Sequence, residues 1–289
     1  PVVTGFGMGQ STSKRRQSKK RGAPESKTIQ RRLITREDPK SPISESYRTL
    51  RTNILYSQAD KKIKSILVSS PSPGEGKTTT VANLAITFAN MGKRTLLLDT
   101  DLRRPVIHRV FGIKKEPGMS HYLAGNIEDF DSLIQETDVE NLWVVSAGIT
   151  PPNPSELLMN EQMEILIQEL RKKYDYIILD TPPIGLVADA LNLVKHADAT
   201  IYMIRQDYTK RGMLESINQK YAKGEIKNIS FVLNHFVHRA KYGYGYGYGY
   251  GYGYGYGYGY NRYNNGYGEA PSTASQLKRS WVKFKRKFE

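Results

Sequence analysis

The residues with the clearest chemical signal form a glycine-containing loop that ends in Gly-Lys-Thr. Residues 69–80 read Ser-Ser-Pro-Ser-Pro-Gly-Glu-Gly-Lys-Thr-Thr-Thr, after an apolar run at 66–68 and before apolar residues at helical spacing from 81 to 89. A strand, a glycine loop and a helix in this order form a cradle for phosphate groups. The backbone N–H groups of such a loop and the positive end of the helix dipole both face the anion.

The side chains of this loop have separate expected tasks. Gly74 and Gly76 let the backbone curl around the phosphates. Lys77 is expected to reach the β- and γ-phosphates, and the Thr78 hydroxyl is expected to hold Mg²⁺. Pro71 departs from the strict pattern, which has a glycine there, and an ordinary turn between a strand and a helix is the alternative interpretation. The residues expected to bind the nucleotide are Gly74, Glu75, Gly76, Lys77, Thr78 and Thr79.

Acidic residues end two further apolar runs. Asp99 and Asp101 follow one run, and Asp180 follows another. Carboxylates at the ends of buried strands are costly unless they are solvated, paired or bound to a metal. Next to a phosphate-binding loop, a strand-end aspartate such as Asp180 orients Mg²⁺ directly or through water, and a helix cap is the alternative. The expected metal-site residues are Thr78, Asp99, Asp101 and Asp180.

A spare carboxylate beside the γ-phosphate can accept the proton of an attacking hydroxyl group. Attack by water would give an ATPase, whereas attack by a tyrosine hydroxyl would give a kinase. Asn234, which ends the apolar run 231–233, is a candidate adenine contact, with a plain turn residue as the alternative. The candidate catalytic residues are Lys77, Asp99, Asp101 and Asp180.

The middle of the chain alternates between strand and helix patterns. Strands are predicted over 65–70, 94–99, 142–147, 176–180, 199–204 and 229–233, and helices over 43–57, 77–91, 155–173, 184–195 and 210–223. This alternation predicts an α/β fold of the P-loop NTPase type, with a mostly parallel sheet covered by helices on both faces. Ligands of such sheets lie at the carboxyl ends of the strands, which brings the loop and the acids together.

Both ends of the chain are basic, while the middle is balanced. The net charge is +8 over residues 1–40, zero over 41–234, +2 over 235–260 and +5 over 261–289. Basic ends on a neutral middle argue against a nucleic-acid groove and favour contact with an anionic membrane surface. The chain has no cysteine, and its five histidines show no ligand spacing. We expect a cytoplasmic protein because neither a signal peptide nor a long apolar run is present.

The composition divides the chain into four parts. Residues 1–40 form a predicted disordered basic arm, 41–235 the catalytic domain, 236–268 a Tyr/Gly-rich tail and 269–289 a basic amphipathic end. Glycine at every second position of the tail disfavours a strand. The tail holds twelve of the twenty tyrosines, at Tyr242, Tyr244, Tyr246, Tyr248, Tyr250, Tyr252, Tyr254, Tyr256, Tyr258, Tyr260, Tyr263 and Tyr267.

Several motifs together resemble one family. Pro-Gly-Glu-Gly-Lys-Thr at 73–78, Asp-Thr-Asp-Leu-Arg at 99–103 and Leu-Asp-Thr-Pro-Pro at 179–183 are similar to those of the bacterial tyrosine kinases of capsule and exopolysaccharide synthesis. The stretch 147–158 also resembles the family, as do the tyrosine-rich end and Glu-x-x-Arg-x-x-Arg at 45–51. The unbroken Tyr-Gly repeat, the basic N-terminal arm and the basic end depart from the family pattern.

The resemblance implies ATP and Mg²⁺ as cofactors, with three aspartates around them and either Asp99 or Asp101 as the base. It implies autophosphorylation of the tail between neighbours in a ring-shaped homo-oligomer, such as an octamer, with Glu45, Arg48 and Arg51 at the interface. The implied partners are a transmembrane adaptor of the polysaccharide co-polymerase type and a cognate tyrosine phosphatase. The implied location is the inner face of the plasma membrane, and the implied role is regulation of polysaccharide synthesis and export.

Two other functions fit parts of the sequence. A membrane-associated ATPase switch of the Min/ParA type shares the fold. Such proteins resemble each other in having a lysine early in the phosphate-binding loop, whereas this chain has Ser72 at that position. The second alternative treats the Tyr-Gly repeat as an adhesive or phase-separating segment on a switch domain. Phosphotyrosine formed on incubation with Mg·ATP would distinguish the kinase from both.

Overall fold

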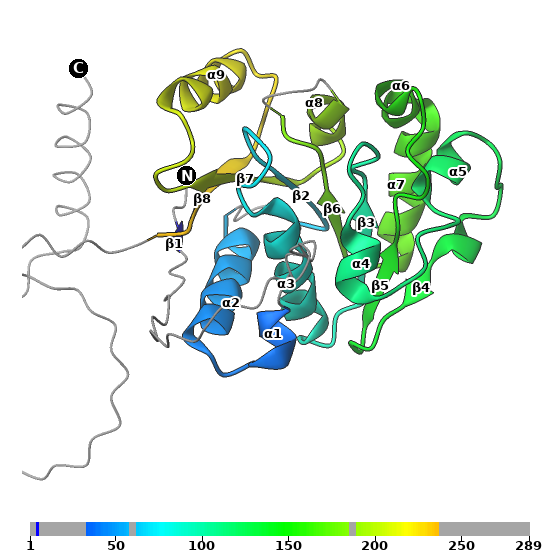
Figure 1. Ribbon diagram of the computed structural model, residues 1–289, viewed down its shortest axis with the longest axis horizontal. Helices are drawn as coiled ribbons and strands as arrows, with labels where there is room; N and C mark the ends of the chain where they lie inside the picture. The colour runs from blue at the N-terminus through cyan, green and yellow to red at the C-terminus, as the bar shows by residue number, and fades with distance from the viewer. Residues whose placement is uncertain (1–3, 6–32, 58–61, 185–188, 237–289) are drawn as a thin grey trace, which may run out of the picture. The chain divides into compact units, whose positions relative to one another are not determined.

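The computed structural model describes residues 4–5, 33–57, 62–184 and 189–236 (Figure 1). The chain divides into two units, residues 1–240 and 241–289, and all described residues belong to the first. The expected tyrosine tail and basic C-terminal end therefore lie outside the described residues. Within the described part of the chain, no helix is long and apolar enough to cross a membrane.

The described strands form one sheet whose order is β1-β8-β7-β2-β6-β3-β5-β4. Neighbouring strands are parallel except for β4 and β5, which are antiparallel. The mostly parallel sheet predicted from the sequence is confirmed. The strands are β1 (Thr4–Gly5), β2 (Ser65–Ser69), β3 (Thr95–Asp99), β4 (Gln135–Glu136), β5 (Leu142–Val145), β6 (Tyr176–Asp180), β7 (Ala199–Arg205) and β8 (Ile229–Asn234).

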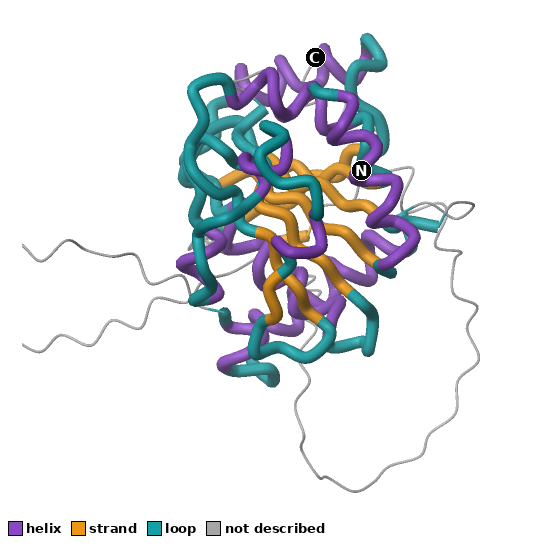
Figure 2. The backbone as a smooth tube through the Cα atoms, turned by 90° about the vertical axis from the view of Figure 1, so that its right-hand side faces the viewer, coloured by secondary structure: helices purple, strands orange, loops and turns teal. Residues whose placement is uncertain are grey.

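Helices cover both faces of this sheet, as Figure 2 shows from the side. One apolar core packs α2 and α3 against one face, and a second core packs α7 and α9 against the other. Successive residues of β2 alternate between the two cores, because Ile66 and Val68 face the first and Leu67 the second. The helices are α1 (Ile34–Glu37), α2 (Pro42–Leu55), α3 (Lys77–Ala89), α4 (Ile107–Phe111), α5 (Met119–Leu123), η1 (Phe130–Leu133), α6 (Pro154–Met159), α7 (Glu161–Lys173), α8 (Asp189–Val194) and α9 (Arg211–Ala222).

The folded unit begins earlier than the sequence analysis predicted. Leu33 and Thr35 are buried, although both fall in the range 1–40 that was assigned to a flexible arm. The backbone N–H and the hydroxyl of Thr35 donate hydrogen bonds of 3.0 and 2.9 Å to the side-chain oxygen of Asn83 in α3. The predicted boundary is therefore several residues too late, because a single buried threonine contact leaves no periodic pattern in the sequence.

The single helix predicted over 155–173 is two helices. Asn160 has extended backbone angles, φ −64° and ψ 144°, and it separates α6 from α7. Its side-chain oxygen accepts a hydrogen bond of 3.4 Å from the backbone N–H of Gln162 and so caps α7. Asparagine is a favoured residue at helix caps, so it can separate two helices even where the apolar periodicity continues from one to the next.

Candidate functional site

The glycine loop connects β2 to α3 at the carboxyl edge of the sheet. Gly74 and Gly76 have φ values of +84° and +98°, a region that glycine enters without steric cost. Helix α3 begins at Lys77, so its free N–H groups and positive dipole end face the loop. The sequence predicted this strand, loop and helix in the correct order and place.

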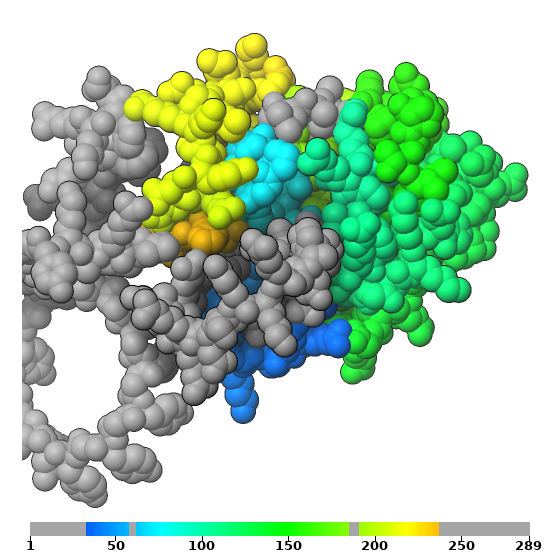
Figure 3. Space-filling model, viewed as in Figure 1, coloured from blue at the N-terminus to red at the C-terminus, as the bar shows by residue number. Residues whose placement is uncertain are grey.

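A pocket of about 400 Å³ opens beside this loop. Figure 3 shows part of this region, where the cyan surface of the loop meets the yellow surface of the segment after β7. The combination of a glycine loop, a lysine, two threonines and an acid suits a Mg²⁺-bound nucleotide phosphate. The pocket is lined by Pro73, Gly74, Gly76, Lys77, Thr78, Thr79, Asp101, Arg104, Val106, Pro183 and Arg205.

Glu75 differs from the other predicted nucleotide-binding residues. Its side chain is buried behind the loop, where the Ser72 hydroxyl donates to Oε1 at 2.9 Å and the Thr209 hydroxyl donates to Oε2 at 2.6 Å. These bonds tie the loop to the segment after β7. Only the backbone of Glu75 is therefore available to a phosphate on the pocket side.

Asp99 lies at the end of β3 and is fully buried. One of its oxygens accepts weak hydrogen bonds from the backbone N–H groups of Val106 and Ile107, at 3.3 and 3.2 Å. Burial and the nearby carboxylate of Asp180 raise the pKa of Asp99 well above its ordinary value, although the backbone bonds oppose this. A raised pKa makes an ionised carboxylate a stronger proton acceptor.

Asp101 is the one of the two neighbouring acids that lines the pocket. Its Oδ1 accepts a hydrogen bond of 3.1 Å from the backbone N–H of Arg104. Burial raises the pKa of Asp101, while the positive charge of Lys77 acts in the opposite direction. Asp101 and Lys77 therefore interact electrostatically across the pocket.

Asp180 ends β6 beside Asp99, and the two are paired in the register of the parallel strands. The backbone oxygen of Asp180 accepts hydrogen bonds from the N–H and hydroxyl of Thr100, at 2.9 and 2.7 Å, which hold the two strand ends together. Asp180 is buried, with 2% of its surface exposed. No helix begins directly after Asp180, so the structure does not support the alternative in which it caps a helix.

The three predicted metal-site acids differ in their access to the pocket, because Asp101 lines it whereas Asp99 and Asp180 do not. Among the described residues, no group of three His, Cys, Asp or Glu side chains is arranged to hold a metal ion. Mg²⁺ commonly takes one or two protein oxygens and completes its shell with water and substrate phosphates. Thr78 and Asp101 line the same pocket and offer such oxygens.

Asn234 lies at the end of β8, directly behind the loop. Its side-chain amide donates a hydrogen bond of 2.8 Å to the backbone oxygen of Glu75, and its oxygen accepts from the N–H of His235 at 2.8 Å. A Cβ atom on Gly76 would lie only 2.1 Å from the Asn234 amide nitrogen, so this close approach requires glycine. The adenine contact of Asn234 stays a prediction.

Two arginines in the pocket wall were not identified from the sequence. Arg104 follows Asp101 closely, and Arg205 ends β7 far away in the chain. The guanidinium of Arg205 donates a hydrogen bond of 3.1 Å to the backbone oxygen of Gly74. The position of Arg104 beside the strand-end acids was the available signal, whereas Arg205 follows an apolar strand and carries no motif.

The three predicted interface residues lie on α2 with different surroundings. Glu45 and Arg48 form an ion pair of 2.6 Å on the exposed side of the helix. Arg51 instead donates a hydrogen bond of 2.5 Å to the backbone oxygen of Thr87 in α3, and burial lowers its pKa. Arg51 therefore joins two helices of one subunit, while Glu45 and Arg48 remain available to a neighbour.

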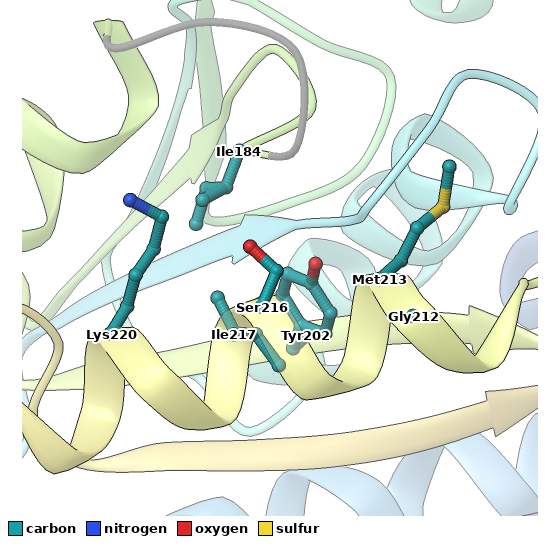
Figure 4. A pocket seen from close by; sticks show the side chains of 7 residues that line it. All are labelled: Ile184, Tyr202, Gly212, Met213, Ser216, Ile217 and Lys220. Carbon is teal, nitrogen blue, oxygen red and sulfur yellow. The ribbon is translucent and has the colours of Figure 1, made fainter.

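A second pocket, of about 170 Å³, lies between α9 and β7 (Figure 4). Its wall is mostly apolar, and the ring of Tyr202 lies at its base. It contains no acidic side chain and is separate from the residues of the glycine loop. It is lined by Ile184, Tyr202, Gly212, Met213, Ser216, Ile217 and Lys220.

Known proteins share this sequence over most of the described region. Residues 63–230 match the sequence family described as an AAA domain. The tyrosine-protein kinase YwqD of Bacillus subtilis is 38% identical over 206 residues, which are 71% of this chain and 86% of YwqD.

Solved structures share the fold. The kinase domain of the Escherichia coli tyrosine kinase ETK superposes with a TM-score of 0.68 and 30% identity, over 75% of this chain and 85% of that domain. The septum site-determining protein MinD of Pyrococcus horikoshii, complexed with Mg-ADP, has a TM-score of 0.50 and 25% identity. That match covers 59% of this chain and 70% of MinD, so the likeness to the kinase domain is the greater of the two.

Proposed function

The chain belongs to the bacterial tyrosine-protein kinases, and we propose that it phosphorylates the tyrosines of its own C-terminal tail between subunits. It is a protein-tyrosine kinase that uses ATP and Mg²⁺. The observation that supports the site assignment best is the pocket in which the glycine loop, Lys77, Thr78 and Asp101 meet. The twelve clustered tyrosines supply the acceptors on the same chain.

The residues of the pocket divide the work of phosphoryl transfer. The loop N–H groups and Lys77 bind the phosphates and offset the charge on the group that is transferred. Thr78 and Asp101 would hold Mg²⁺ in the pocket, and Asp180, at the end of the neighbouring strand β6, would orient it through water. The ion would supply further charge stabilisation. The γ-phosphorus–oxygen bond to ADP breaks as the new bond to the tyrosine oxygen forms, and a carboxylate takes the tyrosine proton.

Asp99 is our choice for the carboxylate that takes this proton. Burial and the neighbouring Asp180 raise its pKa, which makes the ionised carboxylate a stronger proton acceptor than an ordinary aspartate. Asp99 is fully buried at the end of β3, and catalytic hydrogen bonds often form only in the complex with substrate. If Asp101 is the base instead, Asp101→Asn and not Asp99→Asn will remove the acidic limb of the pH–rate profile.

The proposal includes the setting in which the kinase works. A ring of subunits with Glu45, Arg48 and Arg51 at its interfaces would present the tail of one subunit to the pocket of another. A transmembrane adaptor would recruit it to the inner face of the plasma membrane, where the basic ends meet anionic lipids. A tyrosine phosphatase would reverse the modification, and the cycle would regulate capsule or exopolysaccharide synthesis and export.

The direct test is to incubate the purified chain with Mg·ATP and map phosphotyrosine by mass spectrometry. We expect phosphate on several tyrosines between 242 and 267, and none without Mg²⁺. ATP hydrolysis without any phosphotyrosine would contradict the proposal and favour an ATPase switch. The Min/ParA alternative has less support, because the likeness to MinD is weaker than that to the kinase domain.

A further inference from the structure

Three successive carbonyl groups of the glycine loop each accept a hydrogen bond from a distant side chain. The Tyr208 hydroxyl donates to the oxygen of Pro73 at 2.9 Å. Arg205 donates to the oxygen of Gly74 at 3.1 Å, and Asn234 donates to the oxygen of Glu75 at 2.8 Å. The three donors come from the end of β7, the segment after it and the end of β8.

We propose that Tyr208, Arg205 and Asn234 form a carbonyl clamp that positions the loop for phosphate. A peptide unit carries its carbonyl and its N–H on opposite sides. Donors that hold three successive carbonyls therefore fix the orientation of the peptide units between them, and with it the direction of the N–H groups that a bound phosphate contacts. These three are positioning residues, and this role goes beyond the adenine contact predicted for Asn234.

The surroundings of Tyr208 support a fixed geometry. The Arg205 guanidinium lies over the Tyr208 ring at 5.1 Å, so the two donors order each other. A Cβ atom on Gly74 would lie 3.3 Å from the Tyr208 oxygen, which shows how closely the tyrosine approaches the loop. The adjacent Thr209 hydroxyl also bonds the Glu75 side chain.

Pro71 gives a physical reason for the loop to need the clamp. The usual loop has a glycine at that position, whereas this chain has a proline with a fixed φ and no N–H group. The loop therefore has one fewer free backbone donor at its start. Side chains that hold the remaining peptide units in place reduce the ordering cost of binding phosphate.

The proposal rests on the assignment of this pocket to nucleotide and not on which substrate is phosphorylated. Tyr208→Phe removes one donor and keeps the ring under Arg205. We expect Mg²⁺-dependent binding of a fluorescent ADP analogue to weaken about three- to tenfold, the loss typical of one hydrogen bond. The KM for ATP should rise by the same factor with kcat nearly unchanged, because the clamp acts on binding.

Inorganic pyrophosphate separates the clamp from a contact with the nucleoside. In competition against the ADP analogue, pyrophosphate should lose affinity by the same factor in Tyr208→Phe, because the clamp acts on the phosphate cradle. Tyr221→Phe is the matched control, since Tyr221 is 54% exposed near the end of α9 and lies outside the pocket. Its affinities should equal those of the wild type.

The outcomes are distinct. Unchanged pyrophosphate binding in Tyr208→Phe, with wild-type unfolding temperature, overturns the clamp. If Tyr208→Phe does not fold, Asn234→Ala tests the same idea: equal losses for ADP and pyrophosphate support it, and a loss for ADP alone makes Asn234 a base contact and overturns its role in the clamp. A wild-type chain that binds nucleotide but forms no phosphotyrosine contradicts the proposed function and leaves the clamp standing.

Discussion

Asp99 and Asp180 are register partners at the carboxyl ends of the adjacent parallel strands β3 and β6. Two carboxylates side by side in a buried place repel each other, and burial penalises each charge further. Burial is the main reason that the pKa of Asp99 is raised, and the neighbouring carboxylate of Asp180 raises it further. The site is therefore built at a cost to stability, as is common where function needs unfavourable charge.

Asp99→Asn is expected to raise stability at neutral pH while it lowers activity. A carboxyl group with a raised pKa in the folded state loses its stabilising contribution as pH rises through that pKa. Wild-type stability should therefore fall between acidic and neutral pH more steeply than that of Asp99→Asn. Thermal unfolding of both proteins across this pH range measures the difference, and parallel curves would show that Asp99 carries no such cost.

Lys77→Met is expected to abolish tyrosine phosphorylation in a folded protein. Lys77 lines the phosphate pocket and is the first residue of α3. Its replacement therefore removes the positive charge that stabilises the transition state and removes little packing from the core. A fall of at least about a hundredfold in rate is expected. Lys93→Met, at an exposed lysine just before β3, is the control. Normal autophosphorylation in folded Lys77→Met would remove this lysine from the mechanism.

Arg48 and Glu45 offer a test of the ring. Their exposed ion pair contributes under about 1 kcal/mol to the stability of one subunit, so their replacement should leave the fold intact. Replacing Glu45 and Arg48 with alanine should yield smaller particles in light scattering, and adding Arg51→Ala should enlarge the effect. Thermal unfolding checks that losing the Arg51 bond to Thr87 leaves the fold intact. The matched control is the exposed pair Arg211 and Glu215 on α9, whose replacement should leave particle mass unchanged. An unchanged mass in the triple variant would make these residues an ordinary solvated surface.

The basic C-terminal end is expected to bind anionic vesicles. Leu277, Trp281, Phe284 and Phe288 fall on one face of a helical projection, with lysine and arginine on the flanks. Such a pattern suits the surface of a membrane that carries negative charge, and salt should weaken the binding. Cosedimentation with anionic and neutral vesicles measures this. Equal binding to both kinds, or binding to neither, would speak against a membrane role.

The sequence was sufficient where the signals are local. Gly74, Gly76 and Lys77 sit within one short motif between an apolar strand and a helix, so the loop could be placed without the structure. The strand-end acids were found in the same way. Their difference in burial could not be predicted, because Asp99 turns toward the start of α4 while Asp101 faces the pocket.

The carbonyl clamp could not be predicted from the sequence, because its contacts join residues that are far apart in the chain. Tyr208 and Arg205 contact the loop across more than a hundred intervening residues, and nothing near them in the chain marks that contact. The sequence shows Asn234 as an amide at a strand end, but its bond to the loop backbone follows only from the three-dimensional arrangement. Periodicity also concealed the break at Asn160, which separates two apolar helices.

The measurement that tests the central claim most directly mixes two full-length variants with Mg·ATP. One is Lys77→Met, which has an intact tail and no activity, and the other has phenylalanine at all twelve tail tyrosines and an intact pocket. Mass spectrometry then locates phosphate on each chain. The account predicts phosphotyrosine between 242 and 267 of the Lys77→Met chain in the mixture and none in that chain alone. An unmodified Lys77→Met tail in the mixture, while wild-type protein phosphorylates itself, would contradict transfer between subunits.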